Sequence, residues 1–182
     1  MELTLIEFYN TPDGQVCCKP LNEPMFILKE SDTELIASML TAIQELYPSA
    51  FAALAEIYSK SELNKNYYQY KMVHRFIRCN FGEYDALSLD INGGGEFRFE
   101  DVRCPLRGEC LFEGVICRPV LDTKLSSREE QVAKLLAKGY KFEDIGKELH
   151  ISPFTVKRHI ANIKTRLKLN THQIIAKFSK EL

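Results

Sequence analysis

Four cysteines in the middle of the chain match the ligand set of a tetrahedral metal site. Cys104, Cys110 and Cys117 lie within fourteen residues, and Cys79 precedes them to complete the spacing C-x24-C-x5-C-x6-C. Four thiolates form a closed site around one zinc ion, which stabilises the fold and leaves no position open for water or substrate. The pattern therefore predicts structural zinc and argues against hydrolytic zinc chemistry.

Three alternatives to zinc stay open, because the spacing is not that of paired C-x2-C knuckles. The same ligands hold iron–sulfur clusters, which would make the protein a redox or oxygen sensor. A thiol–disulfide switch is the second alternative, since Arg103, Arg107 and Arg118 alternate with the cysteines and a nearby cation lowers the pKa of a thiol. The third is that the cysteines are small buried apolar residues.

The proximity of these cysteines depends on the elements between them. A helix is expected over about 62–78, directly before Cys79. Residues 86–102 (ALSLDINGGGEFRFEDV) have the alternation and turn of a β-hairpin. Because a hairpin brings its ends together, we expect Cys79 to lie near Cys104. The alternating apolar residues are Leu87, Leu89, Ile91, Phe97 and Phe99.

The rest of the first 118 residues predicts a mainly helical α+β domain. A strand is expected at 3–9, a turn at TPDG, and one or two extended pieces within 16–28, which prolines interrupt. A helix then begins near Ser31, which has capping-box spacing to Glu34. A further helix is expected over about 48–59.

Composition and charge place limits on the partners. The chain has 182 residues, 45% of them hydrophobic, without an apolar run of the roughly 18 residues that a membrane span needs. MELTLIEFYN is no secretory signal, so we expect a cytoplasmic protein, in which clustered cysteines favour metal or redox roles. Residues 122–182 have a net charge of +6 and residues 1–121 a net charge of −7. The basic part suggests a polyanionic partner.

The last sixty residues predict a helix-turn-helix. Ser126 and Glu129 have the spacing of a capping box, before a helix that Gly139 ends. HISP is a tight turn in which Ser152 caps the next helix and Pro153 takes its first position. A helix, a short turn and a second helix are the elements that place a recognition helix in the DNA major groove. Helices are expected after Gly139 over about 142–149, 153–167 and 171–180.

The helix over 153–167 has one apolar and one polar face. Its inward residues are expected to be Val156, Ile160, Ile163 and Leu167, at spacings of 4, 3 and 4. Basic side chains suit guanine edges and phosphates, and asparagine can pair with adenine. The residues that would then face outward are Lys157, Arg158, Ala161, Asn162 and Lys164.

The segment LSSREEQVAKLLAKGYKFEDIGKELHISPFTVKRHIANIKTRLKLN resembles the LuxR/GerE-type DNA-binding domain of bacterial transcription regulators. The resemblance covers about residues 123–180, one third of the chain. It implies a four-helix domain whose third helix reads DNA and whose last helix often contributes to dimerisation. At the family's DNA-contacting positions stand Thr155, Lys157, Arg158 and Ala161, the last able only to pack on a thymine methyl.

Two residues depart from the family pattern. Lys141 stands where a Ser, Thr or Asn usually caps the second helix, and Gly146 stands where Ala is usual. Glycine costs about 0.5–1 kcal/mol relative to alanine inside a helix, so we expect a slightly looser second helix. The first 118 residues resemble neither a receiver domain, which alternates strands and helices, nor an autoinducer-binding domain, whose pocket is rich in the tryptophan that this chain lacks.

We therefore predict two domains, residues 1–118 and 125–182, joined by a linker at 119–124. The expected function is a sequence-specific transcriptional regulator that binds double-stranded DNA as a homodimer, with the transcription machinery as a further partner. The Cys-rich domain would serve in sensing, dimerisation or as a scaffold. The alternative is a metal- or iron–sulfur-dependent redox protein or enzyme with an accessory DNA-binding tail. The absence of G-x-S-x-G, Walker-type and H-E-x-x-H motifs argues against an enzyme.

Overall fold

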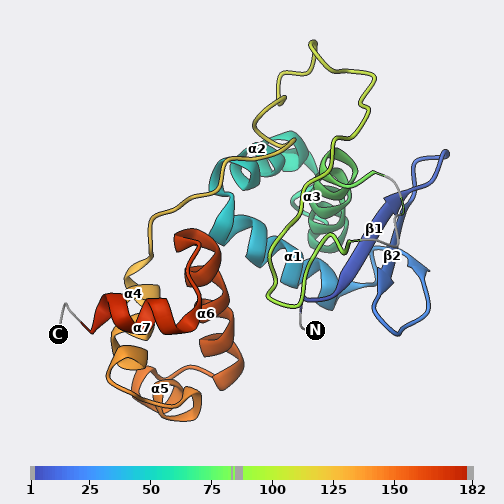
Figure 1. The fold of residues 1–182 in the computed structure, drawn as a ribbon. Helices are drawn as coiled ribbons and strands as arrows, with labels where there is room; N and C mark the ends of the chain where they lie inside the picture. The colour runs from blue at the N-terminus through green and yellow to red at the C-terminus, as the bar shows by residue number, and fades with distance from the viewer. Residues whose placement is uncertain (1–2, 83, 85–87, 180–182) are drawn as a thin grey trace. The chain divides into compact units, whose positions relative to one another are not determined.

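A computed structural model of the chain describes all residues except 1–2, 83, 85–87 and 180–182. The chain separates into two compact units, Met1–Leu121 and Asp122–Leu182, of which the first combines a small sheet with helices and the second is helical (Figure 1). No helix within the described residues is long and apolar enough to cross a membrane. The elements of the first unit are β1 (Ile6–Asn10), β2 (Val16–Pro20), β3 (Phe26–Ile27), α1 (Thr33–Leu46), α2 (Pro48–Tyr58), the 3-10 turn η1 (Ser59–Ser61) and α3 (Lys65–Asn80).

The strands of the first unit form an antiparallel sheet in the order β1-β2-β3. Phe8 on β1 pairs with Cys18 on β2, which pairs in turn with Phe26 on β3. Gly14, at φ +86°, lies in the turn that TPDG predicts between β1 and β2. The strands expected at 3–9 and within 16–28 are confirmed, and α3 packs against β1 and β2.

Two helix starts in the first unit differ from the sequence prediction. The residue that caps α1 is Asp32 and not Ser31, and its carboxylate accepts a hydrogen bond from the Lys29 N–H at 2.7 Å. This bond closes a tight turn from Lys29 to Asp32, and α1 begins directly after it at Thr33. Ser31 is therefore not the capping residue, and the predicted capping box does not form. The third helix begins at Lys65 and not at 62, because the Asn64 side chain accepts a hydrogen bond from the N–H of Tyr67.

An aromatic cluster holds the helices of the first unit to the segment that follows them. Tyr47, between α1 and α2, packs against the rings of Phe97 and Phe99 at 5.8 and 5.3 Å between centroids. Phe76 of α3 and Phe81 contact the same two rings. Burial of these rings removes a large apolar area from water and fixes the segment that leads into the Cys-rich loop.

The predicted hairpin over 86–102 turns where expected but does not form a regular ladder within the described residues. Its pairings there are the single bridges of Ile91 with Phe97 and with Ile6 of β1. The Asn92 side chain accepts from the backbone of the turn, and the carboxylate of Asp90 accepts from the Phe8 N–H at 2.7 Å. Side chains thus take donors that a regular ladder would pair, and Leu87 lies outside the described residues.

The helices of the second unit lie where the sequence predicts them, except that α7 ends at Phe178, before the predicted end at 180, which lies outside the described residues. The side chains of Ser126 and Glu129 form both bonds of the capping box at the start of α4. Gly139, at φ +85°, ends that helix in a Schellman motif, since its N–H bonds the Leu136 carbonyl and the Tyr140 N–H bonds the Leu135 carbonyl. The elements are α4 (Ser127–Ala137), α5 (Phe142–Leu149), α6 (Pro153–Leu167) and α7 (Thr171–Phe178).

Candidate functional site

The helix α6 is rigidly placed at its start and along its inner face. The Ser152 side chain accepts a hydrogen bond from the Thr155 N–H at 3.0 Å, and Pro153 occupies the first helical position. Val156, Ile160 and Ile163 are buried in the core that α4, α5 and α7 share with α6. Their burial leaves the opposite side of the helix turned to solvent.

The outward side of α6 carries positive charge and no negative charge. Lys157 is exposed, and Arg158, Ala161 and Lys164 are partly exposed, as their spacing predicts. The sequence of α6 contains no acidic residue, so nothing on this helix offsets their charge. We define these four residues as the basic face of α6.

The structure corrects one predicted site residue and constrains another. Asn162, expected to face outward, is buried with 7% of its surface exposed. It lies one turn before the buried Arg166 on the side of α6 that faces α4, so the prediction that it faces outward is wrong. The Thr155 hydroxyl lies 2.8 Å from the Ser152 hydroxyl oxygen and therefore takes part in the helix cap.

The turn between α5 and α6 explains one departure from the family pattern. An added Cβ on Gly146 would lie 2.8 Å from the Ile151 carbonyl oxygen, a distance that two such atoms do not tolerate. The Ile151 N–H also donates to the Gly146 carbonyl at 2.9 Å. Gly146 therefore permits a close approach of the turn to α5, which revises the expectation that glycine merely loosens this helix.

Two buried or half-buried arginines tie this turn and helix to α4, and the sequence reading did not identify either role. Arg128 donates from one guanidinium nitrogen to the Leu149 carbonyl at 2.7 Å, at the C-terminal end of α5. Arg166 donates to the Glu129 carboxylate at 3.3 Å. Their partners lie 21 and 37 residues away, so no local pattern could have revealed them. Phe154, half exposed beside the basic face, was also missed.

The four cysteines of the predicted metal site line one cavity in the first unit. This cavity has a volume of about 230 Å³ and is also lined by Glu100, Arg107, Glu113 and Arg118. All six cysteines of the chain, each of them at a described position, are free thiols. Among the described residues, no three cysteine sulfurs lie within 4.8 Å of one another. The structure thus gathers the thiols without closing them into a tetrahedron.

A larger cavity of about 810 Å³ adjoins the first and shares Cys79, Cys104 and Cys117 with it. Burial raises the pKa of the Cys79 thiol to about 11, although the Arg75 guanidinium beside it acts in the opposite direction. Basic side chains are frequent in the lining of this cavity, which also contains the carboxylates of Glu100 and Asp101. The basic residues that line it are Lys71, His74, Arg75, Arg78 and Arg103.

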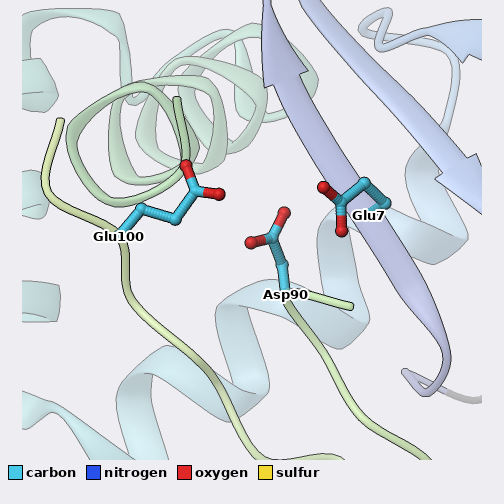
Figure 2. A group of neighbouring side chains, drawn as sticks. All are labelled: Glu7, Asp90 and Glu100. Atoms are coloured by element: carbon cyan, nitrogen blue, oxygen red, sulfur yellow. The ribbon is translucent and has the colours of Figure 1, made fainter. Parts of the chain in front are cut away.

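Three carboxylates gather elsewhere in the first unit, a group that the sequence reading missed. Glu7 of β1, Asp90 and Glu100 each have one oxygen within 4.8 Å of the others, and Figure 2 shows them converging from three separate segments. Asp90 accepts from the Phe8 N–H and Glu100 from the Gly82 N–H. Asp90 and Glu100 therefore each hold a backbone N–H of another segment in place.

The second unit has the architecture of a helix-turn-helix domain, with α5 and α6 joined by a short turn and α4 and α7 packed around them. Residues 123–178 match the family described as bacterial regulatory proteins, luxR family. This confirms the family resemblance derived from the sequence.

Similar curated proteins carry the name response regulator protein VraR. They come from Staphylococcus aureus strains Mu3, NCTC 8325 and COL, and each is 34% identical over 92 residues. The alignment covers 44% of this chain and 44% of each relative, so the chain spans less than half the length of the curated relatives that it matches. No solved structure shows a significant match.

Proposed function

We propose that the chain is a transcriptional regulator that binds double-stranded DNA through α6. The observation that carries the proposal is the basic face of α6, formed by Lys157, Arg158, Ala161 and Lys164, on a capped helix of a LuxR-family domain. A helix of this kind enters the major groove, where basic side chains reach guanine edges and phosphates. Thr155 lies in the first turn of α6, where its bond to Ser152 orients it, and the N-terminal residues of a recognition helix are those that contact base edges.

Charge distribution supports the same function. Residues 122–182 have a net charge of +6, and cations that neutralise phosphates release counterions from DNA. Binding should therefore weaken as salt rises. We further propose that the protein acts as a homodimer on a two-fold site, since dimeric helix-turn-helix proteins bind half-sites about one helical turn apart, and that the transcription machinery is a further partner. The first unit would serve in signal sensing, in dimerisation or as a scaffold.

The test begins with selection of bound sequences from random duplexes by the full chain. Affinity for the selected duplex is then measured by fluorescence anisotropy for Lys157→Ala/Arg158→Ala. We expect this variant to weaken binding about 100-fold, because a good bidentate contact to a base contributes about 1–3 kcal/mol and the loss of two cations also reduces counterion release. The matched control Lys134→Ala/Lys138→Ala removes the same charge from exposed positions near the end of α4 and should change affinity several-fold at most.

The salt dependence of binding separates the two roles of the basic face. Each lost phosphate contact should lower the slope of log affinity against log salt by about 0.9, whereas a lost base contact changes sequence preference. Unchanged affinity in Lys157→Ala/Arg158→Ala, with its helix content preserved, would remove α6 as the DNA-reading element.

A further inference from the structure

The loop of residues 101–118 is long and has little apolar material to hold it. It contains no helix or strand, although every residue in it is described, and in Figure 1 it extends as a yellow-green loop beyond α2 and α3. Leu106 and Leu111 are exposed, Ile116 is the one fully buried apolar side chain within it, and Phe112 packs partly buried against the core. Loops of this length without secondary structure are uncommon in compact domains and usually have a function, and a bound metal ion can restrain a segment that few apolar side chains hold.

The buried side chain of Asn80 joins the end of α3 to the last residues of this loop. Asn80 follows Cys79 and has no exposed surface. Its amide nitrogen donates to the Ile116 carbonyl at 2.8 Å, and its amide oxygen accepts from the Arg118 N–H at 2.7 Å. These bonds grip the chain on either side of Cys117. They hold Cys117 beside Cys79 at the end of α3.

The remaining two cysteines are placed by consecutive turns of the loop. The Arg107 N–H donates to the Cys104 carbonyl, and the Cys110 N–H donates to the Leu106 carbonyl at 2.9 Å. These turns fold the loop back, so that all four cysteines line the cavity of about 230 Å³. Three separate parts of the chain thus meet there through thiols, the group that best binds soft and borderline metal ions.

The charges around the cavity suit a site of four thiolates. Arg107 and Arg118 line the cavity, and Arg75 lies against Cys79. A zinc ion with four thiolates has a net charge of −2, which such cations offset. The carboxylates at the cavity are already engaged, because Glu100 accepts from the Gly82 N–H and Glu113 from the Gly108 N–H at 2.6 Å.

We propose that Cys79, Cys104, Cys110 and Cys117 bind one zinc ion, which fastens the loop of residues 101–118 to the end of α3. The sulfurs stand farther apart than a tetrahedral ion requires, and the exposed turns at Cys104 and Cys110 are the parts that close around the metal. The proposal does not depend on DNA binding by α6, so each can fail without the other.

The first experiment measures metal in the full chain, purified under reducing conditions without chelator. Elemental analysis should find about one zinc per chain, as a closed four-thiolate site requires. Metal-free protein titrated with cobalt should develop the absorption of thiolate-bound cobalt and saturate at one ion. Iron with acid-labile sulfide would overturn zinc in favour of a cluster, and protein that neither contains nor takes up zinc would overturn the site.

Variants then assign the ligands. Cys104→Ser/Cys110→Ser changes two partly exposed positions and should lower the zinc content at least tenfold. Leu111→Ser, in the same loop and 91% exposed, and Cys17→Ala, a buried thiol of β2, are matched controls that should retain one zinc. Full zinc content in the double variant would overturn the assignment of the ligands. If that variant unfolds, the cobalt titration of the unmodified chain still tests whether a thiolate site for one ion exists.

Discussion

The guanidinium of Arg166 lies 3.3 Å from the carboxylate of Glu129, and both side chains are almost completely buried. The other oxygen of Glu129 accepts from the Ser126 N–H at 2.7 Å and so closes the capping box of α4. Arg166 also donates to the Lys124 carbonyl at 2.8 Å. One ion pair therefore joins the start of α4, the end of α6 and the segment that enters the domain.

We expect Arg166→Ala to destabilise the second unit by about 3–5 kcal/mol, because it leaves the Glu129 carboxylate buried without its cation. The double variant Glu129→Leu/Arg166→Met should recover part of this loss, since it removes both charges, but it also loses the Ser126 capping bond and the bond to the Lys124 carbonyl. Hydrogen exchange of α4 and α6 peptides measures the local free energy of opening. A loss below about 1 kcal/mol in the single variant would show that the pair behaves like an exposed one.

The turn between α5 and α6 should respond in opposite directions to two substitutions. Gly146→Ala should lower stability despite its better helix propensity, because the new Cβ meets the Ile151 carbonyl at 2.8 Å. His150 is exposed and has φ +53°. His150→Gly should raise the stability by about 1 kcal/mol, since glycine adopts this conformation without penalty. His150→Ala is the matched control and should bring no gain. Thermal unfolding midpoints measure all three, and a stabilised Gly146→Ala would contradict the close approach.

Asn80 should control the order of the loop that contains the cysteines. Asn80→Leu keeps the size of the side chain but leaves the Ile116 carbonyl and the Arg118 N–H without this partner, at a cost of about 1–3 kcal/mol each. Hydrogen exchange in peptides spanning 101–118 should accelerate. The control Asn64→Ala removes an exposed cap of α3 and should cost about 1 kcal/mol without a selective effect on that loop. Equal exchange in both variants would argue against the clamp.

His74 should make the first unit less stable in mild acid. Burial, followed by the charges of Arg78 and Lys71, lowers the pKa of His74 below its ordinary value of 6.5, against a smaller opposing effect of the Gly14 backbone. Below pH 6.5 the unfolded chain then binds a proton more readily than the folded chain, so stability falls as pH decreases from 6.5 through the folded pKa.

His74→Gln tests this pH dependence because glutamine does not titrate. Tyrosine fluorescence reports mainly on the unfolding of the first unit in urea, since Tyr140 is the one tyrosine of the sequence outside residues 1–121. The urea midpoint of the unmodified chain minus that of the variant should be constant above about pH 7. At about pH 5 this difference should be smaller, because only the unmodified chain loses stability through His74. A difference independent of pH would show that His74 does not titrate in this range.

Local patterns were sufficient for the helices of the second unit. The capping box at Ser126, the glycine at 139 and the Ser152-Pro153 start each involve residues within a few positions of one another, and all three occur as predicted. The same locality explains the correct apolar stripe of α6. Asn162 lies off this apolar stripe and is nevertheless buried, because periodicity within one helix does not show which further positions the neighbouring segments cover.

The amino-acid sequence by itself determined the helix-turn-helix family, the basic face of α6 and the set of four cysteines, because these rest on residue types at short spacings. Only the tertiary structure decided that Arg166 joins Glu129, that Gly146 admits a close turn, and that Asn80 places Cys79 beside Cys117. These relationships link residues through packing and buried hydrogen bonds between segments far apart in the chain. Their free energies depend on exclusion from water, which a local pattern does not specify.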